Sequence, residues 1–355
     1  MKKHNVIDLF CGCGGLSKGF EMAGYNIVGG VDFNKEAIET FNKNFSNAKG
    51  ICGDILNLSE DEIKEKFGNI KDVDVIIGGP PCQGFSSANR NRIDDDPRNK
   101  LFFQFVKFVD IIQPKAIVIE NVRGIVTQDN GYAKNTIYDI FTSRGYNVTH
   151  KILDASDYGV PQKRLRNFFV ITKNKTFDFE KIEKNMKKVT VEDAIGDLYD
   201  LEKENGDIFE NNQNKMSEYA KKMNKNSKIY NHEVRYPAKI VQERISYVKQ
   251  GENWQAIPDE LFKNQRSNRH SSAYKRLNEK DVSVTIDTGN THSNYFHPLY
   301  NRIPTVREAA RIQSFPDDFQ FLGSRTAQYK QVGNAVPPLL SFAVANELKG
   351  VLNDE

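Results

Sequence analysis

The chain has 355 residues, of which 38% are hydrophobic and 27% are charged, and its formal net charge is +3. This size and balance suit one large domain or two ordinary ones with a well-buried core. No apolar run reaches membrane length and the N-terminus lacks a signal-like segment, so we expect a soluble cytoplasmic protein that spans no membrane.

Short apolar runs alternate with amphipathic stretches over residues 1–172, which predicts a mostly parallel α/β sheet. The expected strands are 5–10, 27–31, 73–77, 116–120, 148–153 and 167–171, and the expected helices are 18–23, 35–44, 63–67, 100–112 and 133–143. Val/Ile runs in several of these strands indicate that helices cover both faces of the sheet.

The composition changes after residue 172. Residues 173–214 hold 7 Lys/Arg against 11 Asp/Glu, whereas residues 215–280 hold 15 against 7. The basic stretch is a candidate phosphate-binding surface, with a solvated lysine-rich face as the alternative. Alternation over 282–288 predicts a strand. Thr305 and Glu308 predict a capping box that starts a helix, and the last helix is expected from about 338 to 352.

A glycine-rich turn, Asp8-Leu-Phe-Cys-Gly-Cys-Gly-Gly-Leu-Ser, follows the first strand and opens a helix. Such a turn lets a ligand lie against the backbone and the helix N-terminus. The dinucleotide pattern is only partly matched, because Ser17 stands where a third glycine is required. Asp32 and Asp54 follow later strands and could accept ribose hydroxyls, which favours an adenosine-containing ligand. Each acid alone could equally be a cap or turn residue.

A cysteine stands at the end of another strand, directly after Gly78-Gly-Pro-Pro. Proline ends strand pairing, so this segment is expected to project Cys82 out of the sheet. Glu120 ends a neighbouring strand, and Arg164 and Arg166 alternate at the start of the next, so both are expected on one face. A thiol, a carboxylate and two arginines at one edge indicate a catalytic cluster rather than a core cysteine and a capping acid.

The other cysteines, Cys11, Cys13 and Cys52, form no paired C-x-x-C set with Cys82, and no histidine cluster completes a zinc site. We therefore expect free thiols and no metal.

Six ordered blocks closely resemble those of the bacterial DNA (cytosine-5) methyltransferases of type II restriction–modification systems. They are Asp8-Leu-Phe-Cys-Gly-Cys-Gly-Gly, Gly78-Gly-Pro-Pro-Cys-Gln-Gly-Phe-Ser, Glu120-Asn-Val, Gln162-Lys-Arg-Leu-Arg, Thr305-Val-Arg-Glu-Ala-Ala-Arg-Ile-Gln-Ser-Phe-Pro-Asp and Gln331-Val-Gly-Asn-Ala-Val-Pro-Pro. The resemblance implies a Rossmann-like fold that depends on S-adenosyl-L-methionine, with a smaller, irregular target-recognition domain. Residues 1–172 would be catalytic and cofactor-binding, 173–304 would read DNA, and 305–355 would return, with the last helix completing the catalytic domain.

The resemblance also implies residue roles. Cys82 would be the nucleophile that adds to C6 of a flipped-out cytosine, with Glu120, Arg164 and Arg166 around the base. S-adenosyl-L-methionine would be held by Phe10, Gly12, Gly14, Gly15, Leu16, Asp32, Phe33, Asp54, Ile55, Pro80, Asn334 and Val336. DNA contacts would come from Ser86, Arg90, Arg266, Arg269, Thr288 and Asn290. The last four lie in two predicted DNA-reading loops, 266–272 and 287–294, which combine arginine, asparagine and small residues.

The implied partner is double-stranded DNA, alone or together with a cognate restriction endonuclease that acts on the same site. A monomer suffices, because each chain carries one implied active site. Three alternatives stay open at this point. They are an RNA methyltransferase of the same chemistry, a nicotinamide-dependent oxidoreductase suggested by the glycine turn and Asp32, and a catalytically silent DNA-binding protein.

Overall fold

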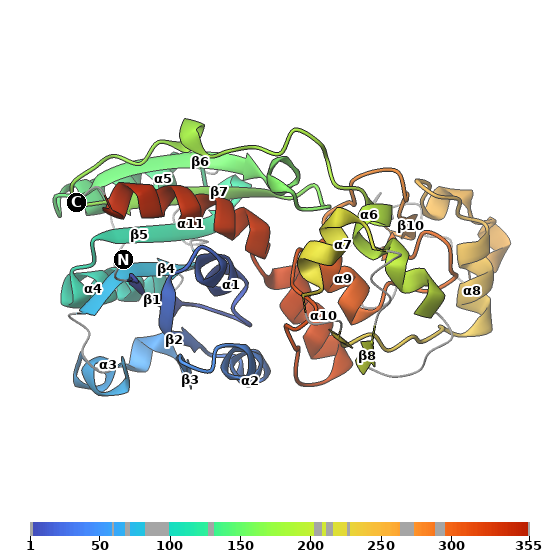
Figure 1. Cartoon of the computed structure of the whole chain (residues 1–355), viewed down its shortest axis with the longest axis horizontal. Coiled ribbons are helices and arrows are strands. Elements are labelled where there is room, and N and C mark those ends of the chain that lie inside the picture. Colours follow the sequence, from blue (N-terminus) through green and yellow to red (C-terminus); the bar gives the residue numbers. More distant parts are fainter. Residues whose placement is uncertain are drawn as a thin grey trace. The chain divides into compact units, whose positions relative to one another are not determined.

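The structure is a computed structural model that describes residues 3–58, 60–67, 72–81, 99–126, 131–201, 208–210, 216–225, 228–262, 273–287 and 295–353. The chain divides into two compact units (Figure 1). The first unit comprises residues 1–158, 165–185 and 335–355, and the second comprises 159–164 and 186–334. The backbone therefore passes between the units after residues 158, 164, 185 and 334.

The first unit is built on a seven-stranded sheet with the order β3-β2-β1-β4-β5-β7-β6. Neighbouring strands are parallel except that β7 runs antiparallel to both β5 and β6. The strands are β1 (Asn5–Leu9), β2 (Asn26–Asp32), β3 (Lys49–Cys52), β4 (Val73–Gly78), β5 (Ala116–Val122), β6 (Asn147–Asp154) and β7 (Leu165–Thr172). This mostly parallel sheet confirms the predicted fold class, and each of the six predicted strands is present.

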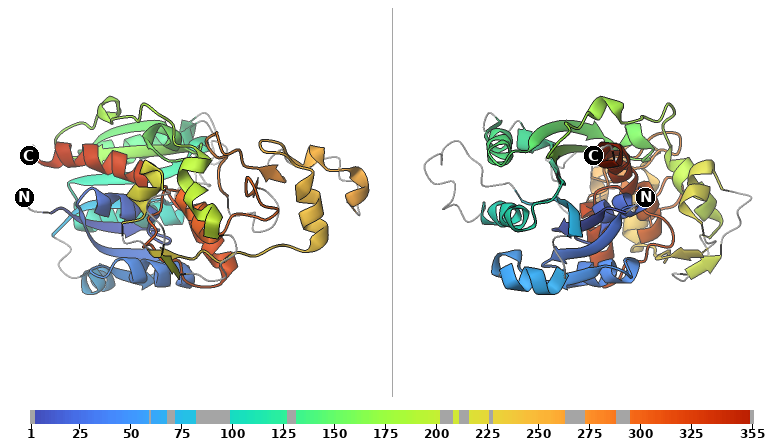
Figure 2. Two further views of the ribbon diagram at one scale, coloured as in Figure 1. Left: turned by 45° about the vertical axis from the view of Figure 1, so that its right-hand side comes forward. Right: turned by 60° about the vertical axis from the view of Figure 1, so that its left-hand side comes forward.

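Helices cover both faces of this sheet (Figures 1 and 2). On one face α3 (Glu60–Phe67), α4 (Lys100–Ile112) and α5 (Tyr132–Thr142) pack on the strands, and the fully buried Phe102, Phe105 and Phe108 of α4 belong to this core. On the other face lie α1 (Gly15–Met22), α2 (Lys35–Asn44) and α11 (Pro338–Asn353). Apolar strands such as β4, buried along its whole length, follow from this double cover.

The first and last helices of the chain pack against each other at Gly19 of α1. A Cβ on Gly19 would lie 2.5 Å from the backbone oxygen of Pro338 and 2.5 Å from the backbone nitrogen of Phe342, so only glycine permits this approach. The Ser341 hydroxyl also donates a 2.6 Å hydrogen bond to the carbonyl of Leu16. The C-terminal helix, predicted close to its observed bounds, thus completes the first unit.

The second unit holds short elements. They are α6 (Val191–Ile195), α7 (Glu218–Met223), α8 (Lys239–Ser246), α9 (Val306–Ile312), α10 (Arg325–Asn334), the antiparallel pair β8 (Ile208–Glu210) and β9 (Lys228–Tyr230), and the parallel pair β10 (Lys275–Arg276) and β11 (Tyr295–Phe296). Every residue of α9 is buried, and Thr305 and Glu308 form the predicted capping box at its start.

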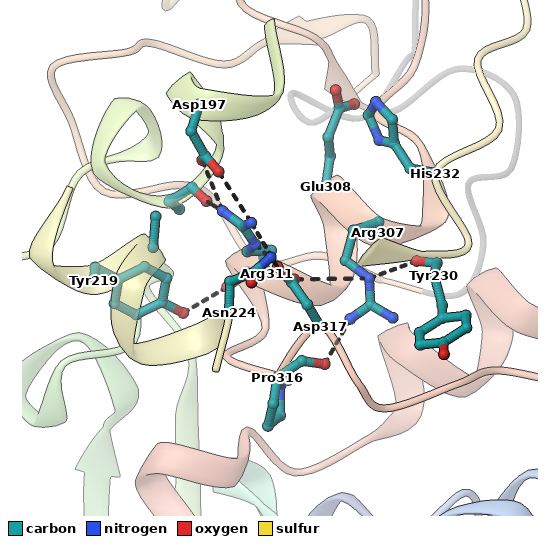
Figure 3. Close-up of polar contacts among 12 residues, drawn as sticks. Asp197, Tyr219, Asn224, Tyr230, His232, Arg307, Glu308, Arg311, Pro316 and Asp317 are labelled. Atoms are coloured by element: carbon teal, nitrogen blue, oxygen red, sulfur yellow. Dashed lines mark hydrogen bonds and ion pairs between the residues drawn. The ribbon is translucent and has the colours of Figure 1, made fainter. Parts of the chain in front are cut away.

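Charged side chains of α9 are buried in ion pairs (Figure 3). Arg311 donates hydrogen bonds of 2.7 Å to Asp197 and 2.7 Å to Asp317. Arg302 pairs with Glu308 at 2.7 Å. Burial alone would raise the pKa of Glu308, but the Arg302 guanidinium holds it well below its usual range. The core of the second unit therefore contains buried charges whose desolvation is offset by specific ion pairs.

The predicted domain boundaries and the compact units differ in position. The boundaries were expected after residues 172 and 304, whereas the units change after 185 and 334. Phe179 is buried and the Asn185 N–H donates to the carbonyl of Asp157, which ties residues 173–185 to the first unit. Helices α9 and α10 contact each other, and α9 contacts α6, so both belong to the second unit.

The strand predicted over 282–288 is not formed over the described residues 282–287. Ser283 makes an isolated bridge with Gln162, and the backbone N–H and C=O of Ile286 bond to side chains instead of to a second strand. Residues 288–294 lie outside the described residues. Among the helices that the structure describes, none is long and apolar enough to cross a membrane.

Candidate active site

The turn after β1 places three residues in the left-handed region of backbone conformation, and two of them are glycines. Gly12 and Gly14 have φ values of 52° and 95°, and Phe10 before them has 66°. A Cβ on Gly14 would collide with Phe45 and lie 3.0 Å from the Phe41 ring, whereas one on Gly12 would meet no atom within 4 Å. Gly12 therefore faces open space from a turn that Gly14 makes possible. Gly15 and Leu16 follow as the buried first residues of α1.

Asp32, at the end of β2, holds this turn in place. One carboxylate oxygen accepts the Gly12 N–H at 2.9 Å and the other accepts the Asn34 N–H at 2.8 Å. Burial raises the pKa of Asp32, while these backbone donors oppose the rise. A carboxylate has about four acceptor sites, so Asp32 can accept a ligand hydroxyl beside its backbone donors. The neighbouring Phe33 is 78% exposed and offers an uncovered aromatic ring beside the carboxylate.

The remaining predicted cofactor residues of the first unit follow other strands. Asp54 follows β3 and caps a 3₁₀ turn by accepting the Leu56 N–H at 3.0 Å, and Ile55 is buried beside it. Pro80 follows β4 and is buried, with its carbonyl held by the Asn121 side chain at 2.9 Å. These residues therefore follow the carboxyl ends of β1 to β4, where open α/β sheets bind ligands. Val336 is buried, whereas Asn334 is exposed at the end of α10 in the second unit.

Glu120 and Arg166 form an ion pair at the carboxyl end of β5. Arg166 lies opposite Val122 in the antiparallel register, two residues along from Glu120, so both side chains emerge on one face. Their Nε and Oε1 atoms are 2.9 Å apart, and both side chains are mostly buried. A Cβ on Gly79 would lie only 3.3 Å from the second carboxylate oxygen. The carboxylate thus lies against the segment that leads through Pro80 and Pro81 to Cys82.

Arg164 has other partners, although it is only two residues from Arg166. It precedes β7, belongs to the second unit and is buried. Its Nη1 donates to the carbonyl of Ile286 at 2.9 Å and its Nη2 to the carbonyl of Gly333 at 2.7 Å. The two arginines of the Gln162-Lys-Arg-Leu-Arg block therefore contact different groups.

Several predicted site residues lie outside the described residues. They are the nucleophile candidate Cys82 and the DNA-contact candidates Ser86, Arg90, Arg266, Arg269, Thr288 and Asn290. Within the described ranges there is no group of three or more His, Cys, Asp or Glu side chains that could hold a metal ion.

The family of C-5 cytosine-specific DNA methylases matches residues 4–350 of this chain. The chain belongs to that family. The protein is therefore a DNA (cytosine-5-)-methyltransferase, a member of an enzyme class that depends on S-adenosylmethionine and acts on DNA.

Curated relatives align with almost the whole methylase. Type II methyltransferase M.DdeI of Desulfomicrobium norvegicum is 39% identical over 97% of this chain and 88% of its own length. Type II methyltransferase M1.HphI of Haemophilus parahaemolyticus is 39% identical over 96% of this chain and 85% of its own.

A solved structure from E. coli, described as a DNA modification methyltransferase encoded within a prophage, covers 99% of the methylase and 100% of its own chain, with a TM-score of 0.81 and 31% identity. The S. pombe Dnmt2 methyltransferase covers 98% and 99% of the two chains with a TM-score of 0.62 at 17% identity, which supports the fold alone.

The sequence predicted no separate role for Asn121 or Gln162 of the methylase, and it named Gly79 only as part of the segment before Cys82. Asn121 holds the Pro80 carbonyl, Gly79 leaves room for Glu120, and Gln162 binds the backbone of Ile286. The signal for Asn121 was its place in the Glu-Asn-Val block, and the signal for Gln162 was its place two residues before Arg164. Neither position shows which backbone group the amide would meet.

Proposed function

We propose that this methylase transfers a methyl group from S-adenosyl-L-methionine to C5 of a flipped-out cytosine in duplex DNA, with Cys82 as the nucleophile. The observation that carries the proposal is the Glu120–Arg166 ion pair, 2.9 Å between Nε and Oε1, beside the Gly79 backbone three residues before Cys82. A carboxylate held there suits recognition of the cytosine N3 edge next to a nucleophile.

The other cysteines support this choice of nucleophile. Attack requires a thiolate, and burial raises the pKa of Cys11 well above its usual range and that of Cys13 to about 12. Both thiols are therefore protonated at neutral pH. Cys52 is exposed, but it ends β3, the outermost strand at that side of the sheet, and β2 and β1 lie between β3 and β4. Cys82 alone follows β4, whose parallel neighbour β5 carries Glu120.

The turn and the strand ends fit the proposed cofactor. Gly12 faces open space, so the ligand can approach the backbone there, and Asp32 and Asp54 offer carboxylate oxygens for ribose hydroxyls. Phe33 offers an aromatic face for the adenine. We assign Phe10, Gly14, Gly15, Leu16, Ile55, Pro80, Asn334 and Val336 to the same site. S-adenosyl-L-methionine supplies an electrophilic methyl group on a sulfonium.

The proposed reaction passes through a covalent bond between Cys82 and the cytosine. The Cys82 thiolate adds to C6, which makes C5 an enamine carbon. C5 would then bond to the methyl carbon as the bond between that carbon and the sulfonium sulfur breaks, and the donor would leave as S-adenosyl-L-homocysteine. Loss of the C5 proton then breaks the C6–S bond and returns the thiolate, leaving 5-methylcytosine. Glu120 holds N3 and the exocyclic amine and stabilises the proton that N3 gains, while Arg166 fixes the carboxylate. Because C6 is inaccessible in a stacked duplex, the base must flip out.

The remaining assignments belong to the same proposal. Residues 173–304 read the DNA sequence, with Arg266, Arg269, Thr288 and Asn290 at base edges, and Ser86 and Arg90 contact DNA from the segment after Cys82. The protein acts in the cytoplasm as a monomer without a metal. Its type II relatives support a protective role beside a cognate restriction endonuclease that cleaves the same site.

The test is transfer of labelled methyl from S-adenosylmethionine to unmethylated genomic DNA, followed by base analysis. Wild type and the control Cys52→Ala should place label in 5-methylcytosine, whereas Cys82→Ala should give none. Glu120→Gln should lower the rate by 100-fold or more, in line with loss of general acid–base help. Label in tRNA but not in DNA would show that the protein is an RNA methyltransferase. Transfer by Cys82→Ala at the wild-type rate would overturn the mechanism.

A further inference from the structure

The backbone of Ile286 is held on both sides by side chains of the Gln162-Lys-Arg block. Its N–H donates to the Gln162 Oε1 at 2.9 Å, and its carbonyl accepts from the Arg164 Nη1 at 2.9 Å. All three residues are at most 2% exposed. In a β-sheet, the backbone N–H and carbonyl of such a residue would bond to a neighbouring strand. Here the Gln162 and Arg164 side chains take the place of that strand.

Backbone bonds extend the same contact. The Lys163 N–H donates to the Ser283 carbonyl at 2.9 Å, and the Ser283 N–H donates to the Pro161 carbonyl at 3.0 Å. The Thr285 hydroxyl donates to the Lys163 carbonyl at 2.7 Å. Residues 283–286 are therefore aligned along residues 161–164 within the second unit.

The two side chains also reach the helices of the second unit. Arg164 donates through Nη2 to the carbonyl of Gly333 in the last turn of α10. Gln162 donates to the carbonyl of Ile312 at 3.4 Å and contacts the side chain of Gln313, at the end of α9. We call Gln162, Arg164 and Ile286 the Ile286 clamp.

Each segment that meets at the Ile286 clamp continues directly into residues of the proposed function. Residue 286 precedes the predicted DNA-reading loop 287–294 by one position. Gly333 precedes the predicted cofactor residue Asn334. Arg164 precedes Arg166, the partner of Glu120, by two positions. Two residues of extended backbone span about 7 Å, so each of these functional residues lies within about that distance of the clamp along the chain.

We infer that Gln162 and Arg164 are positioning residues that couple the base of the DNA-reading loop to the segment carrying Arg166. The inference rests on the proposed function and gives Arg164 a role other than contact with the cytosine. When the loop meets its own sequence, the clamp keeps residue 286 aligned with residues 161–164. Without the clamp, the methylation rates at the correct DNA sequence and at incorrect sequences become more alike.

The experiment uses the full-length enzyme on unmethylated plasmid DNA, with bisulfite sequencing of the product. Wild type first defines the methylated sequence. Arg164→Met and Gln162→Met are then compared with the control Arg144→Met, which removes a surface arginine paired with Asp110. The quantity measured is the ratio of initial rates at the wild-type site to those at sites differing by one base pair.

Positioning predicts that both clamp variants lower this ratio about tenfold, equivalent to about 1.4 kcal/mol, while Arg144→Met leaves it unchanged. If Arg164 contacts the cytosine, or if it only stabilises the fold, rates fall equally at all sites and the ratio stays constant, which would overturn the inference. Absence of methylation by wild type would instead reject the proposed function.

Hydrogen exchange gives a readout that does not depend on activity. In Gln162→Met without DNA, the peptide containing the Ile286 amide should exchange at least tenfold faster, while the β4 peptide over 73–78 keeps its wild-type rate. Unchanged exchange at Ile286 would contradict the clamp even if the variant lost activity.

Discussion

Replacing Gly19 by alanine tests the packing of the first helix on the last. The added methyl would lie 2.5 Å from two backbone atoms, the oxygen of Pro338 and the nitrogen of Phe342, and nearer still to the Ser341 Cβ. Backbone atoms cannot rotate away, so the helices must separate by about 1 Å to reach an ordinary carbon contact of about 3.5 Å. Overpacking of this kind costs about 1–3 kcal/mol.

Two smaller terms modify this figure. Separation weakens the Ser341 hydrogen bond to the Leu16 carbonyl, which contributes about 1 kcal/mol. Alanine is about 1 kcal/mol better than glycine inside a helix. Because these terms nearly cancel, Gly19→Ala should destabilise the protein by about 1–3 kcal/mol. The KM for S-adenosylmethionine should rise as well, since Leu16 in α1 and Val336 just before α11 are proposed cofactor residues.

Gly350→Ala is the matched control, because it changes a glycine of α11 whose Cβ would meet no atom within 4 Å. Urea unfolding followed by circular dichroism should show a lower midpoint for Gly19→Ala and an equal or higher midpoint for Gly350→Ala. Equal stability of the two variants would refute the argument that Gly19 is required for this approach.

Three further predictions concern buried polar groups. Burial raises the pKa of Asp8 to about 8, so its contribution to stability is present below about pH 4 and is lost as the pH rises through 8. Between pH 5.5 and pH 8 the free energy of unfolding should therefore fall less for Asp8→Asn than for wild type, and equal falls would contradict this. Arg311→Met should cost about 3–5 kcal/mol in urea unfolding, because Asp197 loses the cation it pairs with and Asp317 keeps only the more distant Arg307, at 3.9 Å. A change below 1 kcal/mol would exclude a stabilising ion pair. Asn121→Ala should release the Pro80 carbonyl and lower the single-turnover methylation rate about tenfold with little change in the melting temperature. The control Asn147→Ala removes a similar bond, from a β6 side chain to the Lys173 carbonyl after β7, and should keep the rate.

Local pattern was enough to predict the framework of the first unit. Helices α2 and α4 have the predicted bounds, because an apolar stripe and defined end residues specify each. No range was predicted for strand β3, although Asp54 was expected to follow a strand, since Lys49-Gly-Ile-Cys buries only Ile51 and shows no apolar run. The antiparallel direction of β7 was not predicted either, because pairing direction depends on the path of the chain and not on the strand's own residues.

The sequence predicted residues at strand ends but not their partners. Arg164 was expected beside Glu120 because alternation places residues 164 and 166 on one face. Strand β7 begins only at Leu165, and the carbonyls that Arg164 meets are 122 and 169 residues away in the chain. Contacts between residues so far apart in the chain produce no periodic pattern near Arg164 from which its partners could be predicted. Apolar and polar residues do alternate over 282–287, but side chains bond to the Ile286 backbone where a neighbouring strand was expected, so no strand forms.

The pairing of α1 with α11 has a consequence for how the protein is made. Helix α1 ends at Met22 and its partner begins at Pro338, so about 315 residues must be synthesised between them. At 5–20 residues per second this takes roughly 15–60 s, during which the side of α1 that packs on α11 has no partner. The first unit is therefore complete only once α11 has been synthesised, which makes the nascent chain a natural client for chaperones and makes loss of α11 damaging to the part that is built first.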